Sequence, residues 1–303
     1  LNCVANGKIL KEKIFDNIWI QPAAGDAGGA LGAAYSFYYE ELKNKRRIDQ
    51  KNQDKMQGAY LGPKYTNQVI EEFLHTVNAK YTFINNEDEL INVVSNLLSK
   101  EKVIGWHYGR MEFGPRALGN RSIIGDPRSN IMQSKMNLKI KFRESFRPFA
   151  PAVINERVNE WYEFNFESPY MLFVAKINKN KRIVLKNKDI QKKGIEKLKI
   201  KKSEIPAVTH VDYSARIQTV HKATNERFYK LLLKFEEITG CPNIINTSFN
   251  VRGEPIVCTP EDSYNCFMRT EMDILVIDNY LLYKEKQPKF QNNENWRNKF
   301  KLD

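Results

Sequence analysis

A glycine- and arginine-rich segment at residues 109–128 has the residue types that bind anions. Residues 109–122 read Gly-Arg-Met-Glu-Phe-Gly-Pro-Arg-Ala-Leu-Gly-Asn-Arg-Ser, and Gly-Asp-Pro-Arg follows at 125–128. Glycine lets main-chain N–H groups approach a ligand, and the planar guanidinium of arginine suits bidentate contacts with phosphate or carboxylate. A structural loop with Glu112 and Asp126 paired to arginines is the alternative, but it leaves two of the four arginines unmatched. We therefore expect an anion site here.

A second basic cluster follows at Lys141, Arg143 and Arg147, where the cations are interleaved with phenylalanines. If this stretch is extended, residues 141, 143, 145 and 147 share one face, and three cations point the same way. Such a face would hold a triphosphate or an acyl phosphate. A solvated edge strand is the alternative interpretation of the same pattern.

Residues 209–220 contain a polar line through an otherwise apolar stretch. Alternation places one set of polar residues on one face of an expected strand. This set is His210, Asp212, Ser214, Arg216 and Gln218. A guanidinium on a half-buried strand needs an anionic partner, which makes Arg216 a candidate for ligand binding. A single histidine is usually a satisfied structural group, so a structural role for His210 stays open.

The sequence Ile-Asn-Thr-Ser-Phe-Asn at 245–250 places a hydroxyl pair between two asparagines, directly after an expected strand. Asn246, Thr247, Ser248 and Asn250 offer hydrogen-bond donors and acceptors that suit phosphate or adenine. An ordinary polar turn would have the same composition. This segment therefore indicates a site only in combination with the other three.

Several common catalytic signatures do not occur in the sequence, while Cys-His or Ser-His-Asp catalysis, which has no motif here, stays open. There is no GxSxG, Walker lysine loop, HExxH or GxGxxG pattern. The four cysteines form no CxxC pair and the four histidines are scattered singly, so zinc-ligand spacing does not occur. Free thiols indicate a reducing cytoplasm.

No apolar run reaches the roughly 18–20 residues of a membrane span, so we expect no membrane partner.

The net charge of +12 is concentrated in one short stretch. Between Lys176 and Lys202 there are twelve lysines and arginines and two acidic residues, which accounts for ten of the twelve net charges. A nucleic-acid-binding fold would spread its charge over a face. A solvated basic insertion at 176–204 is therefore favoured over contact with nucleic acid or an acidic membrane.

Hydrophobic periodicity predicts alternating helices and strands, as in an α/β protein with a mixed sheet. The 303-residue chain has 42% hydrophobic and 28% charged residues, which is typical of globular proteins. Helices are expected after Asp26, at about 66–77, 88–100 and 228–239, and from 259. Strands are expected at 14–20, 103–108, 243–246, 273–278 and 280–283.

Taken in order, these segments and the run Pro-Ala-Ala-Gly-Asp-Ala-Gly-Gly-Ala closely resemble the carbamoyltransferase family of nodulation factors and antibiotic biosynthesis. The resemblance implies an actin/sugar-kinase-like domain and a YrdC-like domain with a twisted sheet and helices. The implied division is a remnant of the first domain at 1–40, a linker at 41–58, the YrdC-like domain with its basic insertion at 59–285, and a flexible tail at 286–303. We therefore expect a fragment of a longer enzyme.

The resemblance implies a reaction in two stages. The YrdC-like part splits carbamoyl phosphate and joins the resulting carbamate to ATP, which gives carbamoyl adenylate and pyrophosphate. The actin-like part passes the carbamoyl group to a hydroxyl of a sugar or another small acceptor. Magnesium is expected on the triphosphate.

Five residues match the motif positions at which the family contacts carbamoyl phosphate and nucleotide. They are Arg116, Lys141, Arg147, Arg216 and Ser248. Spacing adds Arg143, Asn246, Thr247 and Asn250 as further ligand-binding residues, with His210 as another candidate. A sugar-kinase-like phosphotransferase and a nucleic-acid-binding module are the alternative functions. The oligomeric state stays open.

The resemblance also implies roles for three residues near the N-terminus. Asp26 matches an aspartate that completes an iron(II) site with two histidines, and Asn2 and Asn6 match nucleotide-contacting positions. The HxxxH pair that would supply the histidines does not occur in this sequence, so the iron site would be incomplete. We therefore expect the chain to make the activated carbamoyl group but not to deliver it alone. An acid at a helix N-terminus is the alternative role for Asp26.

Overall fold

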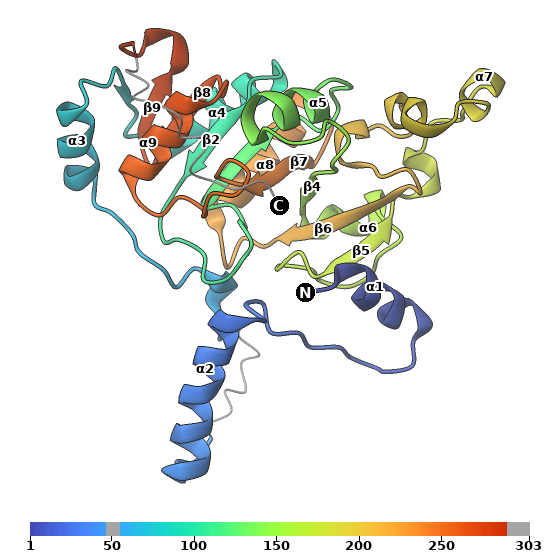
Figure 1. Cartoon of the computed structure of the whole chain (residues 1–303), viewed down its shortest axis with the longest axis horizontal. Coiled ribbons are helices and arrows are strands. Elements are labelled where there is room, and N and C mark those ends of the chain that lie inside the picture. Colours follow the sequence, from blue (N-terminus) through green and yellow to red (C-terminus); the bar gives the residue numbers. More distant parts are fainter. Residues whose placement is uncertain (47–54, 290–303) are drawn as a thin grey trace.

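In the computed structural model, which describes residues 1–46 and 55–289, a mixed sheet of nine strands forms the centre of the fold (Figure 1). The strand order is β1-β9-β8-β2-β3-β7-β4-β6-β5. The strands are β1 (Thr82–Phe83), β2 (Ile104–His107), β3 (Arg121–Gly125), β4 (Ala150–Ile154), β5 (Phe173–Lys176), β6 (Ser214–Val220), β7 (Asn243–Ser248), β8 (Ile274–Ile277) and β9 (Tyr280–Tyr283).

Neighbouring strands in this sheet run in both senses. The pairs β2/β8 and β4/β6 are parallel, and the other six pairs are antiparallel. Every residue of β2, β3 and β4 is buried, which is typical of strands covered on both faces. The α/β fold with a mixed sheet that the sequence predicts is thus confirmed.

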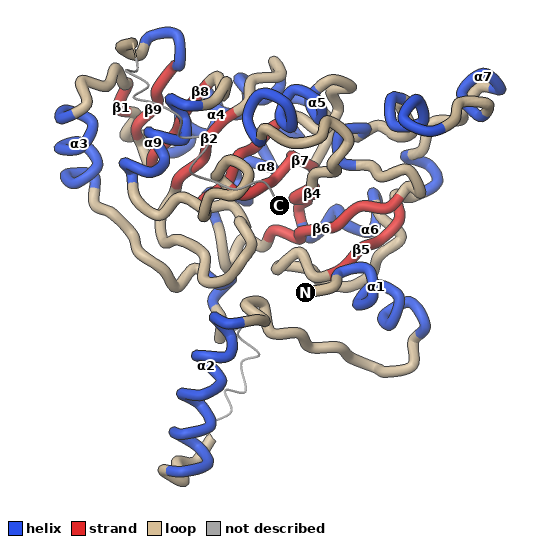
Figure 2. Tube along the Cα trace, in the orientation of Figure 1, coloured by secondary structure: helices blue, strands red, loops and turns tan. Residues whose placement is uncertain are grey.

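Helices cover both sides of the sheet (Figure 2). On one side, α4 (Glu87–Ser99) and α8 (Glu226–Thr239) pack against each other, and α8 contacts β4 and β7. On the other side, α5 (Met132–Met136) packs on β3, where a Cβ added to Gly125 would lie 3.1 Å from the Met136 sulfur. The other α-helices are α1 (Cys3–Glu12), α2 (Asp26–Ser36), α3 (Asn67–Thr76), α6 (Val158–Trp161), α7 (Asn187–Ile190) and α9 (Pro260–Arg269).

Several predicted helix ends are confirmed by their capping contacts. Thr66 Oγ1 accepts a hydrogen bond from the Val69 N–H at the start of α3. Thr259 and Asp262 form a capping box at the start of α9. Gly240 ends α8 with a φ of 72°, a left-handed conformation that glycine adopts without strain.

Three predictions about extended structure are wrong. Residues 14–20 form no strand, because none of the strand pairs in the described residues includes them, and Ile14 and Phe15 are 70% and 68% exposed. Lys141 ends a π-helix, Asn137–Lys141, which continues α5, so 141–147 is not extended. Strand β6 begins at Ser214, and the two polar residues predicted before it lie in a turn.

The N-terminal segment and the basic insertion extend from the sheet domain (Figure 1). Helix α1 packs on β5, whereas α2 projects away and has no buried residue. The insertion forms an arm with α7 at its outer end, and the Lys181–Glu204 and Arg182–Glu163 ion pairs lie at its base. None of the helices in the described ranges has both the length and the apolar character needed to cross a membrane.

Candidate functional site

The register of β4, β6 and β7 places several predicted site residues on one face of the sheet. Asn246 and Gln218 lie opposite alanines two residues apart on β4. Because side chains alternate along a strand, Asn246 and Ser248 share this face with Gln218 and Arg216. Thr247 points to the opposite face, so the structure does not bring it together with the others.

The loop between β2 and β3 lies over this face and is held by buried polar contacts. Glu112 Oε1 accepts hydrogen bonds from the main-chain N–H groups of Leu118 at 2.6 Å, Asn120 at 2.9 Å and Arg121 at 3.4 Å. Burial raises the pKa of this carboxyl, and the N–H contacts oppose that shift. Gln218 Nε2 donates to the Leu118 carbonyl at 2.7 Å. The loop is therefore fixed both by its own carboxylate and by the sheet.

The four arginines of the 109–128 segment have different surroundings. Arg128 pairs with Asp126 at 2.6 Å, and Arg110 donates to a main-chain carbonyl at 3.1 Å. Arg121 is fully buried and donates to five main-chain carbonyl oxygens, those of Pro63, Tyr108, Gly109, Asn120 and Cys258. Arg116 is the member of the four whose side chain makes no hydrogen bond or ion pair with the described residues.

Arg116 lies near Arg216, which comes from β6. Arg116 Nε is buried, and the Arg216 side chain likewise has no hydrogen-bond or ion-pair partner within residues 1–46 and 55–289. Burial, followed by the charge of Arg116, lowers the pKa of Arg216, and Cys3 opposes the shift. Two half-buried guanidinium groups without a counter-charge have the chemistry to accept an anion between them.

Lys141 is buried beside the end of β7. Its Nζ contacts the Ser248 main-chain carbonyl, Ser248 Oγ at 3.2 Å, and the Asn250 main-chain and side-chain oxygens at 2.9 and 2.8 Å. Burial, followed by the charge of Arg143, lowers the pKa of Lys141 to about 7. An anion bound nearby would favour the ammonium form. Ligand binding by Lys141 stays a prediction, because its Nζ contacts only oxygens of Ser248 and Asn250 within the described residues.

Arg143 links Lys141 to the other cations. Burial and then the charge of Arg147 lower the pKa of Arg143 to about 10, with further contributions from Arg216 and Arg252. Glu144 opposes this shift and pairs with Arg147 at 2.8 Å. These mutual effects define a cationic cluster formed by Arg116, Lys141, Arg143, Arg147, Arg216 and Arg252.

His210 lies in the turn before β6. Its Nδ1 is 3.4 Å from Ser214 Oγ, and that hydroxyl donates its proton to Asp212 Oδ1 at 2.6 Å. Burial lowers the pKa of His210, Asp212 raises it, and Arg216 lowers it further. The imidazole is therefore near the cationic cluster but contacts its own turn, and ligand binding by His210 stays a prediction.

The N-terminal candidates lie outside the cationic cluster. Asn2 Oδ1 accepts from the Ala5 N–H at 3.1 Å and caps α1, while Asn6 Nδ2 donates to the Leu172 carbonyl at 3.0 Å. Their contact with nucleotide stays a prediction. Asp26 is exposed in the first turn of α2. Across the described ranges, no group of three or more His, Cys, Asp or Glu side chains could hold a metal. Asp26 therefore does not fit an iron site with these residues, and we derive no step through iron.

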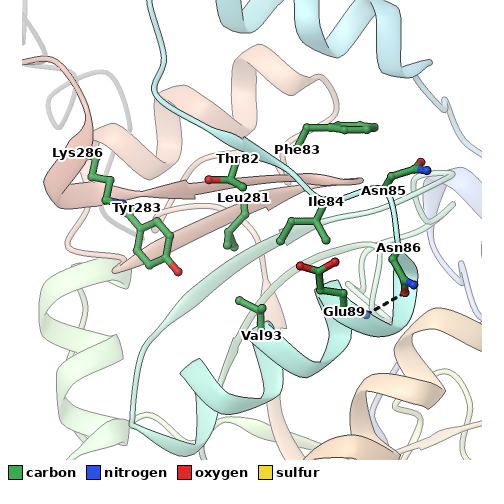
Figure 3. Close-up of a pocket in the computed structure, with 10 residues that line it drawn as sticks. All are labelled: Thr82, Phe83, Ile84, Asn85, Asn86, Glu89, Val93, Leu281, Tyr283 and Lys286. Atoms are coloured by element: carbon green, nitrogen blue, oxygen red, sulfur yellow. Dashed lines mark hydrogen bonds between the residues drawn. The ribbon is translucent and has the colours of Figure 1, made fainter.

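A hollow of about 570 Å³ lies near the opposite edge of the sheet, between β1, β9 and α4 (Figure 3). It contains no predicted site residue, and its charged residues are Glu89 and Lys286. The lining consists of Thr82, Phe83, Ile84, Asn85, Asn86, Glu89, Val93, Leu281, Tyr283 and Lys286. Because cations do not converge on it, we do not assign the anion chemistry to this hollow.

Three residues of the site were not among the predicted binding residues. Arg252 follows the Asn-Thr-Ser-Phe-Asn run, and this position could have identified it as a further candidate for anion binding. Gln218 was placed on the polar line with Arg216, yet its amide contacts with the loop depend on the tertiary fold. Glu112 was expected to pair with arginine, whereas it accepts hydrogen bonds from main-chain N–H groups.

Fold and site together define an α/β protein with a cluster of cationic side chains beside its mixed sheet. Residues 95–284 match the family model described as the carbamoyltransferase C-terminus, and residues 1–35 match the carbamoyltransferase N-terminus. The chain belongs to the carbamoyltransferase family. The resemblance on which the sequence-based prediction rested is thereby confirmed.

Three relatives show the range of this similarity. An uncharacterized protein of Synechocystis sp. is 57% identical over 100% of the chain and 49% of its own length. The nodulation protein NolNO of Sinorhizobium fredii is 38% identical over 93% of the chain and 38% of its own length. The 3'-hydroxymethylcephem-O-carbamoyltransferase of Amycolatopsis lactamdurans is 29% identical over 92% of the chain and 46% of its own length. The chain thus spans about half or less of each relative.

Among solved structures, full-length HypF in its phosphate- and nucleotide-bound form is similar to the chain with a TM-score of 0.41 and 15% identity. The similarity covers 65% of the chain and 22% of HypF. A likeness at this level carries no argument about ligands or mechanism.

Proposed function

We propose that the chain is part of an ATP-dependent O-carbamoyltransferase and forms carbamoyl adenylate from carbamoyl phosphate and ATP. Membership of the carbamoyltransferase family supports the carbamoyl chemistry. The name of the Amycolatopsis lactamdurans relative supports an oxygen of a small hydroxyl-bearing molecule as the acceptor. The observation that carries the proposal is the pair Arg116 and Arg216, two neighbouring guanidinium groups without partners in the described chain.

The proposed reaction has three balanced steps. Water cleaves carbamoyl phosphate to carbamate and inorganic phosphate. A carbamate oxygen then attacks the α-phosphorus of ATP, and pyrophosphate leaves. Finally, the hydroxyl oxygen of the acceptor attacks the carbamoyl carbon, the hydroxyl proton is lost, and AMP leaves.

The cationic cluster supplies two adjacent groups of contacts for these reactants. Arg116 and Arg216 would hold the phosphate of carbamoyl phosphate through paired N–H groups. Lys141, which contacts Ser248, and Arg143 would hold the phosphates of ATP. Fixed cations stabilise the negative charge that develops on the phosphate oxygens during adenylation. Arg147 would add to this field, although its ion pair with Glu144 reduces its contribution.

Magnesium would enter with the nucleotide. Bound with the triphosphate, it would neutralise part of the phosphate charge. The described residues contain no cluster of metal-binding side chains, so we assign this ion no protein ligand.

We further propose that residues 1–40 belong to the domain that transfers the carbamoyl group, and that 59–285 activates it. Residues 41–58 would connect the two, and 286–303 would be a tail; residues 47–54 and 290–303 lie outside the described chain. Free thiols at all four cysteines support a cytoplasmic reaction.

The nucleotide product tests this proposal. Full-length protein with carbamoyl phosphate, ATP and a mixture of hydroxyl-bearing metabolites should produce AMP and pyrophosphate. Mass spectrometry should also find a metabolite in which a carbamoyl group has replaced one hydrogen. Formation of ADP and a phosphorylated metabolite would contradict the proposal and favour the sugar-kinase-like alternative.

A further inference from the structure

We propose that Asn246 recognises the NH2 of the carbamoyl group through its Oδ1 atom and thereby selects carbamoyl phosphate over other acyl phosphates. This inference rests on the proposed function and adds a specificity-determining residue to it. It is carried by one buried acceptor, by the contacts that fix its orientation, and by its place among the cations.

Asn246 has an unsatisfied oxygen in the interior of the protein. The residue is 1% exposed on β7. Its Nδ2 donates to Gln218 Oε1 at 2.6 Å and to the Ala117 carbonyl at 3.2 Å. Its Oδ1 is buried and accepts no hydrogen bond from the described residues. Most buried polar atoms have a partner, so a bound molecule is a physical reason for keeping this one free.

The orientation of the Asn246 amide is fixed by two main-chain carbonyls. The Leu118 carbonyl can only accept, so Gln218 must direct its Nε2 there and its Oε1 toward Asn246. The Ala117 carbonyl likewise requires a donor from Asn246. Rotating the Asn246 amide would place oxygen against oxygen at both contacts. The free atom is therefore the acceptor Oδ1.

Asn246 lies between the two parts of the cationic cluster. It shares its sheet face with Ser248, whose Oγ is 3.2 Å from Lys141 Nζ. It shares the same face with Arg216, and its Nδ2 holds the residue next to Arg116 in the loop. A ligand that bridges these cations would therefore pass beside the free oxygen.

Carbamoyl phosphate would supply both an anion for the guanidinium groups and a hydrogen-bond donor for Asn246 Oδ1. Its phosphate carries the negative charge that the guanidinium groups need, and its NH2 is a hydrogen-bond donor. Acetyl phosphate has the same phosphate but a methyl group in place of the NH2. A site that hydrogen-bonds an N–H rejects the analogue without it, because the buried acceptor is then left unpaired.

Calorimetric binding of carbamoyl phosphate and acetyl phosphate to the full-length protein tests the inference. We expect the unaltered protein to bind carbamoyl phosphate at least about tenfold more tightly. Asn246→Leu should reduce this ratio to about twofold or less, because the acceptor is gone. Gln218→Leu is the matched control: it disturbs the same loop contacts, while the Ala117 carbonyl still requires the Asn246 Nδ2 and leaves Oδ1 free, so both affinities should fall while the ratio is retained.

The outcomes separate this inference from the function on which it rests. An unchanged ratio in Asn246→Leu, with thermal unfolding showing a folded protein, would overturn the inference and leave Asn246 with a structural role. Equal affinity of the unaltered protein for both acyl phosphates would also overturn it while leaving the anion site in place. Binding of neither compound would overturn the proposed function itself.

Discussion

Arg116 and Arg216 lie close enough for the charge of Arg116 to lower the pKa of the Arg216 guanidinium. Neither side chain makes a hydrogen bond or ion pair within residues 1–46 and 55–289. Half-buried like charges without partners destabilise a fold unless an anion offsets their repulsion. Arg116 and Arg216 thus differ from Arg121 and Arg128, whose guanidinium groups have structural partners, and this difference supports the proposed anion site.

Replacement of Arg116 should affect activity far more than replacement of Arg110. In Arg116→Ala, the rate of carbamoyl-phosphate-dependent ATP–pyrophosphate exchange should fall by about 100- to 1,000-fold, because an oriented cation is lost from the charged transition state. Arg110→Ala is the control from the same segment, since Arg110 is exposed and contacts only a main-chain carbonyl. Its exchange rate should stay within about threefold of the unaltered protein. Equal losses in both variants would argue against a special role for Arg116.

Replacement of Arg216 should stabilise the protein while reducing its activity. Arg216→Met removes a half-buried cation without a partner, so the free energy of unfolding should rise by about 1 kcal/mol. Arg121→Met removes a cation that donates to five carbonyls, and it should lower the free energy of unfolding by about 3 kcal/mol. Urea denaturation measures both changes. A destabilised Arg216→Met variant would mean that Arg216 has a structural role.

Nucleotide binding should be coupled to proton uptake by Lys141. Its pKa is lowered to about 7 by burial and by Arg143, so at pH 8 most molecules have a neutral amine. Bound phosphate favours the ammonium, so ATP binding at pH 8 should take up protons. Calorimetry in buffers with different ionisation enthalpies measures this uptake. Lys141→Met should lose it, and equal uptake in that variant would assign the proton to another group.

The lowered pKa of Lys141 also predicts how the free energy of unfolding of the ligand-free protein changes with pH. The folded-state pKa of Lys141 is below the ordinary value of 10.5, so the unfolded chain binds more protons between about pH 7 and 10.5. The contribution of Lys141 to the free energy of unfolding should therefore rise with pH across this window. Denaturation of the unaltered protein and Lys141→Met at several pH values isolates that contribution. A difference between them that does not change with pH would contradict the shift.

Glu112 should be important for stability as well as for the loop. Glu112→Ala leaves three main-chain N–H groups without their acceptor and should lower the free energy of unfolding by about 3 kcal/mol. Glu237→Ala is the control, because Glu237 is exposed and pairs only with Lys234. It should change the free energy of unfolding by less than about 0.5 kcal/mol. Similar effects in both variants would mean that the loop is held by its other contacts.

Local signals predicted much of the fold correctly. The capping box at Thr259 and the glycine at 240 are local features, and they mark the ends of helices in the structure. The strand predicted at 14–20 failed because alternation alone supplies no neighbouring strand. The extended prediction at Lys141 missed the helical spacing of Met132, Met136 and Ile140, all fully buried on the helix that ends there.

The sequence was enough to predict which residues belong to the candidate site, but not which hydrogen-bond partners each of them has. The sequence showed four arginines and two acids in one segment, and only the tertiary fold assigns five carbonyls to Arg121 and none to Arg116. The free oxygen of Asn246 likewise depends on contacts with Gln218, which lies 28 residues away in the chain. Such pairings between distant segments leave no local pattern.

Isotope exchange between pyrophosphate and ATP tests the central claim most directly. In the full-length protein, exchange should require carbamoyl phosphate, because carbamate must be present before adenylate and pyrophosphate can form reversibly. Exchange should be largely lost in Arg116→Ala and in Arg216→Met while both variants remain folded. Exchange that proceeds equally without carbamoyl phosphate, or that is unchanged in both variants, would contradict the assignment of carbamoyl activation to this cationic cluster.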